Sequence, residues 1–148
     1  MPKKKVHQDW IDSLSEKAVK KAPEGYEGFV YIIENLTNNK IYIGKKSFYS
    51  YRKKKLTIKE KALPENKRKK FKIDVSETNW QSYTGSCKEL NEDLAIGHKY
   101  IKKILQFCKT RRNMTAWELK FILCSDCLQT EGCYNKNVLG KIFSSDYK

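Results

Sequence analysis

Two tyrosines and an arginine have side chains that can do chemistry on a phosphate group. Tyr31 and Tyr42 are eleven residues apart, and Arg52 follows Tyr42 by ten. The guanidinium of arginine is a rigid fork of donors that suits negative charge on phosphoryl oxygens. A tyrosine hydroxyl has an ordinary pKa of about 10, so it acts as a general base at neutral pH only beside cations. Lys45, Lys46 and Arg52 are the candidate cations closest in sequence.

A predicted β-hairpin positions these tyrosines. Residues 29–33 are β-branched or aromatic, residues 35–39 have turn chemistry, and residues 40–43 resume a strand that ends at Gly44. Alternate residues of a strand share a face, so the two tyrosines lie close together if they face the same side. Core packing is the alternative explanation for two strand tyrosines.

Composition limits the class of protein. The chain has 148 residues with a net charge of +14, and 39% of them are hydrophobic, which predicts one folded domain and a polyanionic partner. Five cysteines without a signal peptide predict reduced intracellular thiols. No apolar run is long enough to span a bilayer, and no helix with one cationic and one apolar face stands out. Nucleic acid is therefore the expected partner.

Much of the charge lies in one segment. Residues 51–72 hold eleven Lys or Arg against two Glu, a local net charge of +9. Such a run is either a solvated loop or an arm that grips phosphates without reading sequence. The cations expected to contact DNA are Lys45, Lys46, Lys53, Lys54, Lys55, Lys67, Arg68, Lys69 and Lys70.

Further elements follow from apolar spacing. Residues 1–21 are predicted to form a short docking helix, residues 88–96 a helix that Gly97 ends, and residues 100–108 a strand. A second helix is expected over residues 114–128, with Thr115 as its N-cap. Its expected core face is Trp117, Phe121, Cys124 and Leu128, with Glu118 one position off that stripe.

The hairpin also has a recognisable signature. Gly28-Phe29-Val30-Tyr31 followed by Tyr42-Ile43-Gly44 resembles the paired motif of the GIY-YIG nuclease superfamily, with Val30 where that motif has isoleucine. Arg52 stands where the superfamily has its arginine. The resemblance covers about residues 28–137, and the basic insertion is similar to those of small phage-encoded, homing-endonuclease-like members. It implies an endonuclease that hydrolyses phosphodiester bonds of DNA.

The resemblance also implies roles for particular residues. Glu118 corresponds to a metal-binding glutamate, and Asn135 to an asparagine in a Tyr-Asn pair, although Asn135 and Asn137 could each be a turn residue. A single carboxylate suits Mg²⁺ or Mn²⁺, which keeps most of its waters and takes phosphate oxygen as a further ligand. Tyr31 is the implied general base and Tyr42 the orienting group, and these two roles could be exchanged.

The predicted fold is α/β (α+β), with a small three-stranded, mainly antiparallel sheet, an N-terminal β-hairpin and flanking helices. Residues 1–25 are expected to form a basic, amphipathic helical extension, and residues 26–148 the nuclease domain with a basic insertion at 53–72. The expected location is cytoplasmic, in the host cell if the protein is phage-encoded. Double-stranded DNA is the expected partner, membranes are not, and a homodimer or a helper protein would select the cleavage site.

Three alternatives remain open at this point. Cys124, Cys127 and Cys133 have partial zinc-ligand spacing without an obvious fourth ligand, so buried or surface thiols are the favoured interpretation. His98 is either an accessory acid or a surface residue. The alternative function is a non-catalytic nucleic-acid-binding domain that retains the nuclease fold. DNA against RNA, and nicking against double-strand cleavage, cannot be read from these residues.

Overall fold

The protein divides into two compact units. The computed structural model describes residues 8–136, 138 and 146. The first unit combines Met1–Phe48 with Asn79–Lys148, and the second is the insertion Tyr49–Thr78. The folded insertion is therefore somewhat longer than the predicted 53–72.

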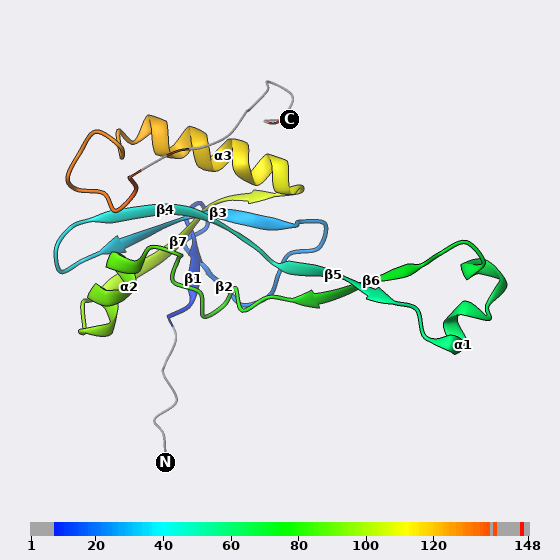
Figure 1. Ribbon diagram of the computed structural model, residues 1–148. Helices are drawn as coiled ribbons and strands as arrows, with labels where there is room; N and C mark the ends of the chain where they lie inside the picture. The colour runs from blue at the N-terminus through cyan, green and yellow to red at the C-terminus, as the bar shows by residue number, and fades with distance from the viewer. Residues whose placement is uncertain (1–7, 137, 139–145, 147–148) are drawn as a thin grey trace, which may run out of the picture. The chain divides into compact units, whose positions relative to one another are not determined.

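A five-stranded sheet is the framework of the first unit (Figure 1). The strand order is β2-β1-β7-β3-β4, and only β1 and β7 pair in parallel. The expected three-stranded sheet is therefore wrong, because two N-terminal strands extend it beyond β7. The strands are β1 (Trp10–Asp12), β2 (Ala18–Val19), β3 (Gly28–Asn35), β4 (Ile41–Ser47) and β7 (Tyr100–Cys108).

The predicted hairpin is confirmed as β3 and β4, and the predicted third strand as β7. In the antiparallel register Tyr31 lies opposite Gly44 and Ile33 lies opposite Tyr42. Residues directly opposite one another share a face. Tyr31 and Tyr42 therefore lie on the same face of the sheet, as diagonal neighbours.

The predicted N-terminal helix is wrong for the residues that the structure describes, and residues 1–7 lie outside them. Trp10 is buried in β1, and its indole donates a hydrogen bond of 2.6 Å to the carbonyl of Trp80. Leu14, which the helical spacing assigned to the same stripe, is 89% exposed. Pairing with β7 satisfies the backbone of β1 and buries its tryptophan, and this outweighs the local helical pattern.

Two helices lie on opposite faces of the sheet, α2 (Lys88–Ala95) and α3 (Arg111–Cys124) (Figure 1). Helix α2 agrees with its predicted position, and Gly97 follows it with a φ of +104°. Helix α3 begins earlier and ends earlier than predicted. Its N-cap is Thr110, whose side chain accepts a hydrogen bond from the Asn113 amide.

The buried side of α3 also differs from the prediction. Trp117 and Phe121 are partly buried and pack against the core, as predicted, but Cys124 is exposed and Leu128 lies beyond the end of the helix. The fully buried residues include Met114 and Ile122. Glu118 is four residues from both Met114 and Ile122, and residues four apart share a helix face. The carboxylate therefore interrupts the buried stripe rather than flanking it.

The insertion folds as a separate β-hairpin with a helical tip. Its strands are β5 (Tyr49–Lys55) and β6 (Phe71–Glu77), and the tip contains α1 (Ile58–Lys61) and the short 3₁₀ helix η1 (Pro64–Asn66). Thr57 caps α1 by accepting a hydrogen bond from the Glu60 amide. The segment is thus an ordered ribbon rather than a loop. Among the described residues, no helix is long and apolar enough to cross a membrane.

Candidate active site

The two signature tyrosines pack together beside two glycines. Their ring centroids are 6.2 Å apart. A Cβ atom on Gly44 would lie 2.5 Å from the Tyr31 hydroxyl, and one on Gly85 would lie 2.9 Å from the Tyr42 ring. Gly85 also has a φ of +85°, which L side chains rarely adopt. Both glycines are therefore required for the tyrosines to approach the backbone so closely.

A third tyrosine, which the sequence did not identify as a site residue, completes this group. Tyr83 makes an edge contact with Tyr31 at 6.2 Å between centroids, and it helps to raise the pKa of Tyr31. The ammonium of Lys46 lies 4.1 Å from the centre of the Tyr83 ring. The signal for Tyr83 was its place in Tyr83-Thr84-Gly85, the same Tyr-x-Gly pattern as in Tyr42-Ile43-Gly44.

Burial raises the pKa values of both signature tyrosines. The pKa of Tyr31 is raised well above 10 by burial, and further by Tyr42, Tyr83 and Glu118. The pKa of Tyr42 is raised by burial too, although a 3.2 Å hydrogen bond to Ser86 opposes the shift. The sequence led us to expect nearby cations that would lower these pKa values. In the protein alone the shift has the opposite direction, so both hydroxyls keep their protons at neutral pH.

Lys45 and Lys46, which we expected to contact DNA, are engaged at this site. Burial lowers the pKa of Lys46, whose ammonium covers the Tyr83 ring. Lys45 Nζ lies 3.7 Å from Glu118 Oε2 and donates a 2.6 Å hydrogen bond to Thr115 Oγ1. Thr115, the residue we predicted as an N-cap, therefore lies within α3 and holds this lysine.

Glu118 combines burial with access to an open cavity. Its side chain is 24% exposed, and burial raises its pKa, while Lys45 partly offsets that rise. The cavity has a volume of about 360 Å³. Tyr42 lines it from β4, an edge strand, and Glu118 lines it from α3, so groups from both faces of the sheet meet there. Its lining is Tyr42, Cys87, Lys88, Glu89, Glu118, Tyr134, Asn135 and Lys136.

The donor set of the cavity fits a divalent ion of the Mg²⁺ type. Within the described part of the chain, no three His, Cys, Asp or Glu side chains come together as a metal cage. Mg²⁺ is held by one or two carboxylates, with waters and substrate phosphates as its other ligands. Glu118 supplies one such carboxylate. The other carboxylate of the lining, Glu89, already pairs with Lys40 and Lys136.

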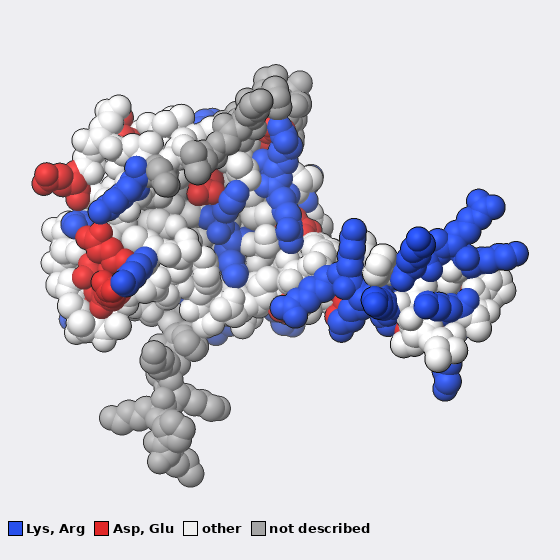
Figure 2. All heavy atoms as spheres, in the orientation of Figure 1, with Lys and Arg blue, Asp and Glu red and all other residues white. Residues whose placement is uncertain are grey.

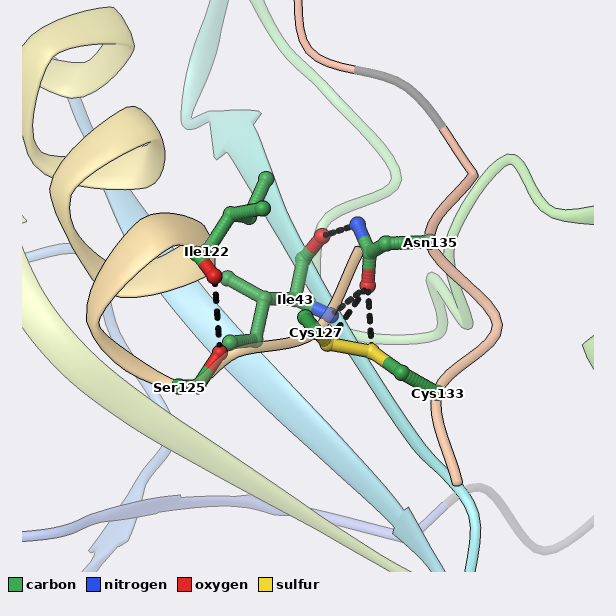
Figure 3. The surroundings of a disulfide bond; sticks show 6 residues. All are labelled: Ile43, Ile122, Ser125, Cys127, Cys133 and Asn135. Atoms are coloured by element: carbon green, nitrogen blue, oxygen red, sulfur yellow. Dashed lines mark hydrogen bonds between the residues drawn. A yellow bond between two sulfur atoms is a disulfide. The ribbon is translucent and has the colours of Figure 1, made fainter. Parts of the chain in front are cut away.

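Asn135 is tied to β4 through both ends of its amide. Its Oδ1 accepts a 2.9 Å hydrogen bond from the Ile43 amide, and its Nδ2 donates a 2.7 Å hydrogen bond to the Ile43 carbonyl (Figure 3). Ile43 lies between Tyr42 and Gly44 of the signature. This arrangement favours a positioning role for Asn135. Asn137, the alternative asparagine, lies outside the described residues.

A disulfide between Cys127 and Cys133 lies next to Asn135 (Figure 3). The Sγ atom of Cys133 is 3.3 Å from Asn135 Oδ1. The expectation that all the cysteines are reduced is therefore wrong at these two positions, whose Cα atoms are 5.3 Å apart, within bonding range. Cys124 is exposed and free. Two of the three sulfurs that suggested zinc are thus bonded to each other.

A polar network holds the segment that contains Asn135. The Tyr134 hydroxyl donates to Asp93 Oδ2 at 2.6 Å and accepts hydrogen bonds from Asn35 and Asn38 in the β3–β4 turn. Asn35 is 1% exposed, and its amide also bonds Nδ1 of His98. His98 therefore belongs to the support of the hairpin, and it does not line the cavity.

Arg52 and the remaining predicted DNA contacts lie in the second unit. Arg52 is exposed on β5, opposite Asp74 of β6. The lysines next to it extend along the same strand, and residues 67–70 follow the helical tip. Figure 2 shows Lys and Arg side chains crowded over this unit.

Comparison with protein families assigns the chain. A family model described as "Putative endonuclease segE, GIY-YIG domain" matches residues 10–138. No curated protein and no solved structure matches the chain. The family match covers both signature tyrosines, Gly44, Glu118 and Asn135, and it includes β1, which we had expected to lie in an extension. The chain belongs to the family of SegE-type GIY-YIG endonuclease domains.

Proposed function

We propose that this chain is a metal-dependent endonuclease that hydrolyses phosphodiester bonds of double-stranded DNA. The observation that supports it best is the half-buried Glu118 carboxylate on the wall of an open cavity that it shares with Tyr42. Burial of a carboxylate is costly, and carboxylates with raised pKa values concentrate at functional sites. A cation bound there would offset that cost.

The lining residues suit the chemistry. A divalent ion on Glu118 would neutralise charge on the phosphate and assist the departing 3′ oxygen. Tyr42 lines the cavity, whereas Tyr31 is 1% exposed and its ring packs against that of Tyr83. These positions favour the exchanged assignment, in which Tyr42 is the general base and Tyr31 keeps its own proton. Because the pKa of Tyr42 is raised in the protein alone, Tyr42 would first have to lose its proton to solvent, which a cation bound in the cavity would favour, before it could take the proton of the attacking water.

Arg52 is proposed to stabilise charge on the phosphoryl oxygens. It belongs to the second unit, so its role requires both units to act on one stretch of DNA. An Arg52→Lys variant keeps the charge but loses the planar fork. It is expected to bind DNA as well as the parent does and to cleave more slowly.

The proposed location is the cytoplasm, where the protein would have access to DNA. For a phage-encoded protein this is the cytoplasm of the host cell. One active site cuts one strand per engagement, so a double-strand break would need a homodimer or a second binding event. A helper protein is the other proposed route to site selection.

Cleavage of supercoiled plasmid tests the proposal. The parent is expected to nick the plasmid with Mg²⁺ or Mn²⁺ and to stop with EDTA. Glu118→Ala is expected to lower the rate by about a thousandfold, because a metal that stabilises transition-state charge is worth several kcal/mol. Glu118→Ala should still bind DNA. The matched control is Glu92→Ala, which removes an exposed carboxylate from α2 outside the cavity.

The outcomes separate the alternatives. Binding without nicking in every metal would favour the non-catalytic nucleic-acid-binding domain. Undiminished nicking by Glu118→Ala would overturn the assignment of the metal site. Comparing the cleavage rates of Tyr31→Phe and Tyr42→Phe decides which tyrosine is the general base. Tyr42→Phe should lose more activity, and a fully active Tyr42→Phe would return the role of base to Tyr31.

A further inference from the structure

The β5–β6 ribbon has two chemically different faces. In its register Lys53 is opposite Ile73 and Lys55 is opposite Phe71, whereas Arg52 is opposite Asp74. Since opposite residues share a face and neighbours along a strand alternate, these pairs divide between the two sides. The first side is called the apolar face and consists of Tyr49, Tyr51, Lys53, Lys55, Phe71, Ile73, Val75 and Glu77. The second is the charged face and consists of Ser50, Arg52, Lys54, Lys72, Asp74 and Ser76.

The apolar face is exposed. Phe71, Ile73 and Val75 of β6 are 50%, 65% and 54% exposed. Apolar residues at alternate strand positions normally mark the side of a sheet that packs on a core. The only buried residue that the structure describes in this unit is Leu56, at the start of the tip. The apolar face is therefore a candidate contact surface.

We propose that the apolar face enters the major groove of duplex DNA and contacts the methyl groups of thymine. This inference rests on the proposed function. It gives the β5–β6 ribbon a preference for certain base sequences, in addition to phosphate contacts that are independent of sequence. Isoleucine, valine and phenylalanine offer the apolar contact that the thymine methyl accepts in the major groove. Lys53 and Lys55 stand directly across the ribbon, where they can reach guanine edges or phosphates.

The dimensions of the ribbon suit this groove. Two paired strands lie about 4.8 Å apart, and the major groove, about 12 Å wide, admits a two-stranded β-ribbon. Seven residues of strand span about 23 Å. This length corresponds to six or seven base pairs at roughly 3.4 Å each.

The charge of the unit selects DNA as the occupant. Residues 49–78 contain eleven Lys or Arg against four Asp or Glu. Three pairs towards the tip of the apolar face, Tyr51–Val75, Lys53–Ile73 and Lys55–Phe71, include no acidic residue. The acidic residue of this face, Glu77, lies opposite Tyr49 in the pair farthest from the tip. The acidic Asp74 lies on the charged face, where its carboxylate is 2.8 Å from Lys54 Nζ. A second copy of the same face would bring lysines against lysines, which opposes pairing of the chain with itself.

A methyl-deletion experiment tests the proposal. Duplexes are first selected from a random library with full-length Glu118→Ala protein, which is expected to bind without cutting. The preferred duplex is then remade with deoxyuridine in place of thymidine, a change that removes only the methyl groups. We expect the uracil duplex to bind about fivefold or more weakly, since two or more methyl groups are no longer buried against the ribbon. In a protein that also contains Ile73→Ser and Val75→Ser, the two duplexes should bind alike.

Controls separate this inference from the proposed function. Ile96→Ser replaces a similarly exposed isoleucine, 75% exposed at the end of α2, and should keep the parent's preference for thymine. Ile73→Val should keep most of it as well. If the parent nicks DNA but the thymine and uracil duplexes bind with equal affinity, the proposed groove contact is wrong. The proposed endonuclease activity would be unaffected by that result. Loss of a dimer in sedimentation of the double variant would reassign the face to a second copy of the chain.

Discussion

The protein contains two long β-hairpins of the same kind in opposite environments. β3–β4 and β5–β6 each align seven residue pairs in antiparallel register. In β3, Phe29, Tyr31 and Ile33 are at most 1% exposed, whereas most residues of β5 and β6 are exposed. The first hairpin therefore obtains its shape from packing and can hold side chains rigidly. The second obtains its shape from its own hydrogen bonds and from its tip, and it offers its side chains to a partner.

Packing around the first hairpin leaves no room at Gly44, and this gives the largest effect expected from the contrast between the two hairpins. In Gly44→Ala the new Cβ would clash with the Tyr31 hydroxyl and ring, at 2.5 and 2.7 Å. Overpacking of this kind costs about 1–3 kcal/mol, and the displaced tyrosine should lower cleavage by about a hundredfold or more, as misplaced catalytic groups do. Urea unfolding and plasmid nicking measure the two effects. Gly132→Ala is the control, because nothing lies within 4 Å of the added atom.

The second hairpin should respond to charge and not to packing. Neutralising residues 67–70 as Lys67→Gln, Arg68→Gln, Lys69→Gln and Lys70→Gln removes four cations after η1. The slope of log affinity against log salt falls by about 0.9 for each phosphate that the protein no longer neutralises. We expect a slope smaller by about 2 to 4 and little change in melting temperature. Titrations at several salt concentrations measure the slope, and an unchanged slope would show that the tip does not bind DNA.

The hairpins also differ in how well the sequence predicted them. The β-branched and aromatic run at residues 29–33, the turn at 35–39 and Gly44 indicated β3 and β4, and the paired motif around Tyr31 and Tyr42 together with Arg52 indicated the family. Local spacing is sufficient there, because each strand is continuous and its neighbour in the sheet follows directly along the chain. In residues 51–72 the density of like charge hid the strands, since β5 is lysine-rich and its apolar partner β6 begins only after the tip.

The site was only partly predictable for a related reason. Motif positions pointed to Tyr31, Tyr42 and Glu118. The raised pKa of each tyrosine and the role of Tyr83 depend on contacts between segments about forty or more residues apart. The two hydrogen bonds from Asn135 to Ile43 span 92 positions. The parallel pairing of β1 with β7, which made Trp10 part of the core, is equally non-local. No periodicity within one segment reports such contacts.

The tyrosine cluster gives a smaller and more specific test. Tyr83→Phe removes a hydroxyl that helps to raise the pKa of Tyr31. The pKa of Tyr31 should therefore fall, with a severalfold effect on cleavage, since a shift of one pKa unit corresponds to about 1.4 kcal/mol. Titration of ¹³C-labelled tyrosine ring carbons by NMR measures the shift. Tyr26→Phe, at an aromatic contact with Phe107, should leave the Tyr31 titration unchanged.

The last contrast concerns a buried lysine of the first unit and the exposed lysines of the ribbon, and it should affect stability and its pH dependence rather than cleavage. Lys102 of β7 is 1% exposed, its ammonium donates to the carbonyls of Gln81 and Tyr83, and burial lowers its pKa to about 8. Its pKa in the unfolded chain is the ordinary 10.5. Between these values the unfolded chain binds more protons, so this lysine makes the free energy of unfolding rise as the pH increases from about 8 to 10.5.

Below pH 8 the cost of burying the charge is fully present, and it is relieved as the pH rises. Lys102→Met should remove this contribution, while Lys103→Met, which removes the neighbouring lysine paired with Glu34, should retain it. Urea unfolding of the three proteins at pH 7, 8, 9 and 10 measures the slopes. If the free energy of unfolding rises equally with pH in Lys102→Met and in the parent, the pKa of Lys102 is not lowered by burial. Lys102 would then behave like the exposed lysines of the ribbon, and the contrast between the two units would fail at this position.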